Sequence, residues 1–157
     1  MRRKDREVVN HEELLQIMRK CLCCNLCLFD EEYPYVVPLS FGVVYEEEKF
    51  TLYFHGAKVG KKIDLLKQNS KVGFSMNCSN KIHLGEVPCN STTEYESICG
   101  NGTLTLVEDV EEKQDALSNL MKQYQPEVQH QFTEQMVNVV AVLKLEVHEI
   151  TGKRLVM

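Results

Sequence analysis

Apolar and polar residues alternate along much of the chain, with polar or glycine-containing turns between the alternating segments. In Phe50–His55, for example, Phe50, Leu52 and Phe54 fall on one side of the pattern. Side chains alternate across a β-strand, so this period predicts strands. The six expected strands are Cys21–Phe29, Tyr35–Val44, Phe50–His55, Lys71–Cys78, Tyr95–Glu108 and Val139–Val147.

Other segments have apolar residues at helical spacing. Asn10 precedes one of them and Asp109 another, and each is followed three residues later by a glutamate, Glu13 or Glu112. This spacing is typical of a capping box at a helix N-terminus. The expected helices are Asn10–Lys20 (10–20), Lys61–Asn69 and Asp109–Tyr124 (109–124), with one helical turn over Thr133–Asn138.

The order of these elements limits the fold. Most of the turns between strands are too short for parallel crossovers, so we expect a mostly antiparallel sheet. Several short strands with few helices favour a closed or nearly closed barrel. Gly100 and Gly102 should bend the strand that contains them, and Ser79–Asn90 is expected to be a loop. The predicted class is mainly β with a few helices, in one domain over residues 1–157 with a basic N-terminal arm over residues 1–9.

Composition narrows the function classes. The chain has 157 residues and a formal net charge of −5, so we expect no nucleic-acid partner. No apolar run approaches the ~20 residues of a membrane helix, so no membrane association is expected. The charged start Met1–Arg6 leads into no apolar signal core. Seven cysteines, an odd number without a secretory signal, indicate reduced thiols and a cytoplasmic protein.

Four of the cysteines are clustered, at Cys21, Cys23, Cys24 and Cys27. The spacing of Cys21, Cys24 and Cys27 matches the first part of a ferredoxin-type iron–sulfur motif, but Glu31 stands where the fourth thiolate belongs. We therefore predict no metal site, and expect small apolar core residues instead. Cys78 and Cys89 flank one loop, and the sequence leaves open whether they approach each other.

The segment Leu52–Leu66 could bind a phosphate. A strand ends at His55, two glycines allow a sharp turn, and a helix begins near Gly60. The free N–H groups at a helix start attract anions. Three positive charges lie in the same segment: Lys58, Lys61 and Lys62. On spacing alone, a turn with solvated lysines stays an open alternative.

Three blocks of the sequence, Tyr33–Phe41, Leu52–Lys62 and Glu94–Gly102, carry a family resemblance. In this order they resemble the nitroimidazole-resistance (Nim-type) flavoproteins, within the pyridoxamine 5'-phosphate oxidase-like, FMN-binding split-barrel group. The termini, Met1–Glu7 and Thr151–Arg154, are similar to that family as well. The resemblance covers essentially the whole chain.

The resemblance implies a six-stranded, mostly antiparallel split β-barrel that forms a homodimer, with one FMN in each of two clefts at the dimer interface. FAD is an alternative, since it offers a phosphate to the same site. The residues implied to flank the isoalloxazine ring are Val37, Leu39, Ser40 and Phe41. Those implied near the ribityl chain and phosphate are His55, Gly56, Ala57, Lys61 and Lys62. Ser97 and Gly100 would close the cleft.

Alternatives stay open for some of these residues. Leu39 and Phe41 could be core residues, and Ser97 could be an ordinary surface or ladder hydroxyl. His55 is the one candidate for a catalytic role, since it could orient a substrate or donate a proton. Binding of ribityl or phosphate oxygens is the preferred interpretation for His55.

The resemblance further implies an oxidoreductase that passes electrons from NAD(P)H to a small acceptor such as a nitroimidazole or another nitroaromatic. Few titratable groups converge on the expected ring slot, so a non-catalytic flavin-binding or sensing module is the alternative. A haem-binding split barrel is a third possibility. Pyridoxamine-phosphate oxidases proper share a C-terminal segment rich in Trp and Arg. This chain has no Trp, which argues against vitamin B6 oxidation.

Overall fold

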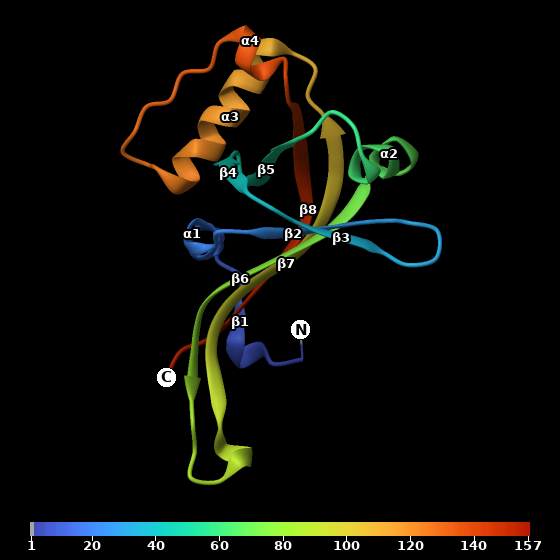
Figure 1. The fold of residues 1–157 in the computed structure, drawn as a ribbon. Coiled ribbons are helices and arrows are strands. Elements are labelled where there is room, and N and C mark those ends of the chain that lie inside the picture. Colours follow the sequence, from blue (N-terminus) through green and yellow to red (C-terminus); the bar gives the residue numbers. More distant parts are fainter. Residues whose placement is uncertain (1) are drawn as a thin grey trace.

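The computed structural model describes residues 2–157, so Met1 of the predicted arm lies outside the described residues. Eight strands form one antiparallel sheet (Figure 1). They are β1 (Glu7–Val8), β2 (Cys24–Leu28), β3 (Tyr35–Leu39), β4 (Phe41–Glu46), β5 (Lys49–Gly56), β6 (Lys71–His83), β7 (Thr92–Leu106) and β8 (Ala141–Leu155). The helices are α1 (His11–Lys20), α2 (Lys61–Gln68), α3 (Val110–Tyr124) and α4 (Glu134–Val137), with 3-10 turns η1 (Lys4–Arg6) and η2 (Pro88–Asn90).

The sheet has the order β3-β2-β6-β7-β8-β5-β4, and β1 pairs with β8. The expected single strand Tyr35–Val44 is in fact two strands, because the chain leaves one edge of the sheet after Leu39 and enters the opposite edge at Phe41. Pro38 lies in the edge strand β3, where its missing N–H costs no central ladder bond. The two edges of a strongly curved sheet thus come together at Ser40. Within residues 2–157, β3 and β4 do not pair with each other, so the sheet does not close into a barrel.

Strands β6 and β7 form a long hairpin that extends away from the helices α3 and α4 (Figure 1). The expected loop Ser79–Asn90 is wrong in its first part, because β6 continues to His83 beyond a bulge between Cys78 and Lys81. Ser79 has a φ of 58° at this bulge. The extra residues in the bulge broke the alternation on which the sequence prediction relied.

At Gly102, one of the two glycines expected to bend β7, the ladder with β8 is irregular. The register between β7 and β8 shifts between Asn101 and Gly102, so that one residue of β8, His148, lies opposite no β7 residue. A Cβ atom on Gly102 would collide with the backbone oxygen of Glu146. Glycine therefore allows the two strands to approach closely where the sheet bends.

Both helix caps predicted from the sequence are confirmed. The side chain of Asn10 accepts a hydrogen bond from the Glu13 N–H (3.1 Å), and that of Asp109 accepts one from the Glu112 N–H (2.8 Å). Helix α3 packs on the sheet so closely that a Cβ atom on Gly42 would lie 2.5 Å from the Leu120 Cα. Among the described residues no helix is both long and apolar enough to cross a membrane.

The core fills the space that the curved sheet encloses and the interface with α1. Phe50, Leu52 and Phe54 are buried there on one face of β5, as their alternation predicted. Cys21 and Cys24 are buried in the same core, whereas Cys23 is exposed. Within residues 2–157, no three His, Cys, Asp or Glu side chains are grouped closely enough to hold a metal ion.

Candidate functional site

The candidate site begins where β5 ends and α2 starts. Gly60 is the N-cap of α2 with a φ of +122°, a conformation that favours glycine, and it offers no side chain to cap the helix. Its carbonyl oxygen accepts bonds from the N–H groups of Ile63 and Asp64. The N–H groups of Lys61 and Lys62 have no hydrogen-bond acceptor among the described residues, so they are available to an anion.

Lys62 places its ammonium group beside this helix start. A Cβ atom on Gly56 would lie only 2.5 Å from the Lys62 Nζ, so the lysine folds back over the end of β5 where a glycine makes room. The side chain is partly buried, and burial lowers its pKa. No hydrogen-bonding or ion-pair partner for this ammonium exists within residues 2–157. A desolvated cation without a partner favours an anionic ligand.

Lys61, the neighbouring residue, is engaged by the protein itself. Its Nζ lies 2.5 Å from a carboxylate oxygen of Asp30 and 5.4 Å from the centre of the Tyr35 ring. The hydrogen bond with Asp30 raises the pKa of Lys61, and the same bond lowers the pKa of Asp30. Lys61 therefore ties the start of α2 to the loop after β2 and to the first residue of β3.

Asp30 is the residue that the sequence analysis missed. It comes in a charged turn, Asp30–Glu32, and nothing in its spacing relates it to the lysines 31 residues later. Only the packing of α2 next to β2 and β3 brings the carboxylate to Lys61. The side chain is about a quarter exposed, so it is accessible at the rim of the site.

The predicted ring-binding residues have different environments. Val37 and Leu39 are partly buried on β3, and Ser40 is exposed at the crossing between β3 and β4. Phe41 is fully buried in the core, so its side chain is not available to a surface ligand, and the core alternative holds for it. Its N–H donates to the Tyr124 hydroxyl (2.9 Å).

His55 does not face the Lys62 ammonium. Side chains alternate along β5, and Tyr53, two residues earlier, packs towards α3 while Phe54 belongs to the enclosed core. His55 correspondingly lines a cavity of about 210 Å³ formed mainly by apolar side chains of α3 and α4. Lys62 instead covers Gly56, and by the same alternation Gly56 is on the face of β5 that carries Phe54. The imidazole and the ammonium therefore lie on opposite faces of β5.

Of the remaining predicted residues, one lies at the site and two lie on another strand. Ala57 is exposed directly after β5, beside Gly56. Ser97 and Gly100 lie on β7, which is separated from β3 by β2 and β6. Gly100 pairs with Phe74, and a Cβ atom there would lie 2.5 Å from that ring and from the Glu149 oxygen, so packing alone requires a glycine. Within one chain, no side-chain hydrogen bond or ion pair joins Ser97 or Gly100 to the start of α2 among the described residues.

Comparison with known proteins identifies related sequences and folds. A protein-family model described as pyridoxamine 5'-phosphate oxidase matches residues 10–154. A comparison with curated proteins found no match. The family match runs from α1 to residue 154, one residue before the end of β8, and thus includes the whole candidate site.

Solved structures share the fold over nearly the entire chain. A candidate 5-nitroimidazole antibiotic resistance protein from Bacteroides thetaiotaomicron is 31% identical with a TM-score of 0.80, over 94% of this chain and 85% of that chain. The FAD and heme binding protein from Mycobacterium smegmatis is 17% identical with a TM-score of 0.80, over 95% and 73%. A NimC/NimA family protein from Clostridium acetobutylicum is 17% identical with a TM-score of 0.55, over 90% and 84%.

Proposed function

The chain belongs to the pyridoxamine 5'-phosphate oxidase family, and on that premise we propose that it is a flavin-binding protein whose phosphate site is the start of α2. The observation that carries the proposal is the Lys62 ammonium, which is partly buried over Gly56 without a partner among the described residues. Beside it are two free helix N–H groups. A phosphate would supply the missing negative charge and accept both kinds of donor.

The residues of this chain would divide the binding of FMN between them. Lys62 and the N–H groups of Lys61 and Lys62 would hold the phosphate. Lys61 would position that helix start through Asp30, at 2.5 Å, rather than serve as a free cation. Gly56 leaves the space in which the ammonium and a phosphate oxygen could approach each other.

The isoalloxazine ring would lie along β3, next to the crossing at Ser40. Val37 and Leu39 supply partly apolar surface there, and Ser40 supplies an exposed hydroxyl. A flavin ring needs a flat apolar slot with a few polar contacts. We propose FMN because its single phosphate is enough to pair with the donors at the start of α2. FAD is the alternative, because one of its phosphates could bind to the same donors.

We propose further that the protein is an oxidoreductase and a homodimer. Support comes from the relative with 31% identity, which is a candidate nitroimidazole resistance protein. When bound, a flavin supplies hydride acceptance from NAD(P)H and electron donation to a small acceptor such as a nitroimidazole. Ser97 and Gly100, whose strand is separated from β3 by β2 and β6 within one chain, are then candidates to face the ring across a dimer interface.

One observation favours a second function, a flavin-binding or sensing module without turnover. His55, the one predicted catalytic residue, lines an apolar cavity of α3 and α4 rather than the phosphate site. Excess NADPH added to the flavin-loaded protein distinguishes the two functions, because a module without turnover leaves the flavin oxidised.

Titration with FMN tests the phosphate site. We expect Lys62→Ala to weaken binding by about 1–3 kcal/mol, the scale of charge-assisted hydrogen bonds, and Lys61→Ala to weaken it less. Replacing both lysines should give at least the effect of Lys62→Ala. Lys67→Ala, an exposed lysine in the last turn of the same helix, is the matched control and should bind like the wild type.

Two results would contradict the proposal. Equal flavin affinity of the Lys62→Ala and Lys67→Ala variants would show that the phosphate is not held at α2. A Soret band after reconstitution with haem, without any binding of FMN or FAD, would show that the cofactor is haem and not a flavin.

A further inference from the structure

Strand β8 changes partners along one of its edges, and a gap separates the two partners. It pairs with β5 up to Glu146 and with β1 from Gly152 onward. Residues 147–151 pair with no strand on that edge within residues 2–157. At roughly 3.3 Å per residue, the gap exposes about 16 Å of strand edge. Backbone N–H and C=O groups on such an edge are a template for another extended chain.

The bulge in β8 explains why the gap exists. His148 is the extra residue where the register with β7 shifts, and a bulge bends and twists its strand. β8 thereby turns away from β5 after Glu146. Helix α1 starts too early to fill the space, since the chain becomes helical at His11 immediately after β1.

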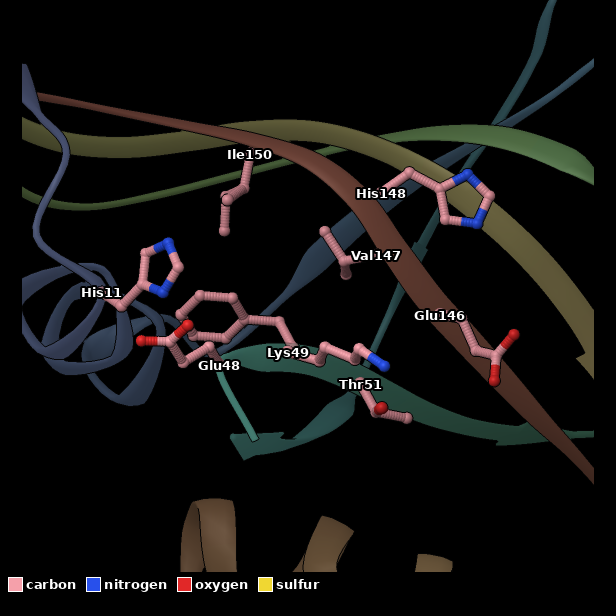
Figure 2. A pocket seen from close by; sticks show the side chains of 9 residues that line it. His11, Glu48, Lys49, Thr51, Glu146, Val147, His148 and Ile150 are labelled. Atoms are coloured by element: carbon pink, nitrogen blue, oxygen red, sulfur yellow. The ribbon is translucent and has the colours of Figure 1, made fainter. Parts of the chain in front are cut away.

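A cavity of about 450 Å³ lies along this gap. Figure 2 shows Val147 and Ile150 pointing into it from β8, with Glu48 on one side and Glu146 on the other. Its volume falls within the range of small-ligand pockets. The cavity is therefore open to a ligand along a strand edge whose backbone groups are unpaired.

The floor of the cavity is apolar, and contacts with neighbouring rings hold its side chains in place. Phe50 is 3% exposed, and the His11 ring packs against it edge-to-face with the ring centres 5.5 Å apart. The His11 Nδ1 lies 2.9 Å from the Tyr45 hydroxyl oxygen, which fixes the orientation of the imidazole. Together with Val147 and Ile150, these rings suit one aliphatic side chain of a ligand.

The rim carries more negative than positive charge. Of the lining residues, Glu48 and Glu146 are exposed carboxylates without a hydrogen-bond or ion-pair partner among the described residues, and Lys49 is the one lysine. Glu47 adjoins the rim in the β4–β5 turn. Basic side chains on either side of an apolar one would complement this arrangement.

This cavity is distinct from the proposed flavin site. Phe50 and Thr51 lie near the start of β5, whereas Gly56 and the Lys62 ammonium lie at its end, five or more residues away. Five residues of a strand span about 16 Å. A ligand here would leave the start of α2 accessible.

We propose that the gap between β5 and β1 is a docking site for a short, extended, basic peptide segment of another protein. The segment adds to the free edge of β8 at residues 147–151 by backbone hydrogen bonds. One apolar side chain of the segment enters the floor formed by Phe50 and Ile150, and its basic side chains pair with Glu48 and Glu146.

A blocked pentapeptide of alternating arginine and valine, added to the purified protein with its flavin, tests this. We expect saturable shifts of the backbone amide resonances of residues 147–151 and of Phe50. Hydrogen exchange should slow at those amides of residues 147–151 that point away from β7. The same peptide with N-methylated amides cannot form the ladder and should produce neither effect. Glu48→Gln combined with Glu146→Gln should weaken binding about three- to tenfold.

Control measurements separate docking at this edge from attraction by net charge alone. Glu111→Gln combined with Glu127→Gln makes the same change in net charge at exposed positions elsewhere and should leave the affinity unchanged. Equal binding of the N-methylated peptide, or equal binding of free arginine amide, would overturn the proposal. It would also fail if the amides of residues 147–151 that point away from β7 were already protected in the free protein because a second copy of the chain covers the edge.

Discussion

Lys61 and Lys62 are adjacent in the first turn of α2, yet their ammonium groups lie in different surroundings. Lys61 pairs with Asp30 and covers the Tyr35 ring, whereas Lys62 is partly buried over Gly56 without a partner among residues 2–157. Adjacent helical residues point about 100° apart, so one of them meets the β2–β3 side and the other the end of β5. The second lysine is therefore the better candidate for a phosphate ligand.

Gly56→Ala tests that assignment by crowding the ammonium rather than removing it. The new methyl group would meet only the far end of the flexible Lys62 side chain, at 2.5 Å, so the fold should tolerate it. We expect flavin affinity to fall about tenfold or more, on the scale of a charge-assisted hydrogen bond, with little change in melting temperature. Flavin fluorescence quenching and thermal unfolding measure the two effects.

Gly73→Ala is the control for this substitution. Gly73 also lies in a strand, and a Cβ atom there would have its nearest neighbour at 3.8 Å, an ordinary contact. It should bind flavin like the wild type. If Gly56→Ala binds flavin equally well, the ammonium is not a phosphate ligand in its present position.

At the scale of elements, the helices were predicted closely and the edge strands less so. A capped amphipathic helix is specified by residues within one or two turns of each other, and α1 and α3 begin where Asn10 and Asp109 predicted. The segment Tyr35–Val44 alternates without interruption, but its two halves occupy opposite edges of the sheet. Alternation reports which face is buried and contains no information on which strand lies alongside.

Removal of the α3 cap should lower stability by a predictable amount. Asp109→Ala eliminates the 2.8 Å bond from the Glu112 N–H and should cost about 1 kcal/mol in the free energy of unfolding. Asp115→Ala, exposed in the middle of the same helix, removes the same charge without a cap. Urea denaturation should show a clear loss for Asp109→Ala and a much smaller change for Asp115→Ala; equal changes would contradict the capping role.

At the scale of the whole molecule, one buried carboxylate joins elements from both ends of the chain. Glu96 of β7 accepts hydrogen bonds from Lys20 of α1 (2.7 Å), Ser79 at the β6 bulge (2.8 Å) and Arg154 of β8 (2.8 Å). Arg154 also donates to Glu13 of α1 (2.7 Å). These contacts hold the N-terminal helix and the C-terminal strand at the base of the β6–β7 hairpin.

This network predicts a pH dependence of stability. Burial alone would raise the pKa of Glu96, but the hydrogen bonds from Lys20, Ser79 and Arg154 outweigh it, so the pKa is lowered from its usual 4.5. A carboxylate with a lowered folded-state pKa stabilises the fold above its unfolded pKa, and this stabilisation is lost as the pH falls through the folded value. The loss should therefore appear below about pH 4.5.

The substitution Glu96→Gln tests how much the Glu96 carboxylate contributes to the pH dependence of stability. It should cost about 1–3 kcal/mol at neutral pH, and its stability should fall less steeply than that of the wild type on acidification. Glu111→Gln, at an exposed position, is the control and should retain the wild-type slope. Parallel slopes of all three proteins, measured by urea denaturation from about pH 3 to about pH 7, would assign the acid sensitivity to other carboxylates.

The proposed homodimer makes flavin binding depend on protein concentration. If the cofactor lies at the interface, light scattering should give twice the 18.1 kDa of one chain. Dilution that dissociates the dimer should release flavin at the same protein concentration, since half of the site leaves with the partner. A monomer that keeps its flavin would show that each chain holds a complete site.

The sequence by itself determined the main helices, both helix caps, the alternation of the main strand segments and the glycine-broken helix start with its lysines. Each of these depends on residues that are close in the chain, where local geometry and side-chain period act directly. The tertiary structure alone decided that Asp30 engages Lys61, that His55 and Lys62 occupy opposite faces of β5, and that β8 leaves a gap beside Glu146. These depend on strand order, register and bulges, which arise from packing between residues far apart in sequence.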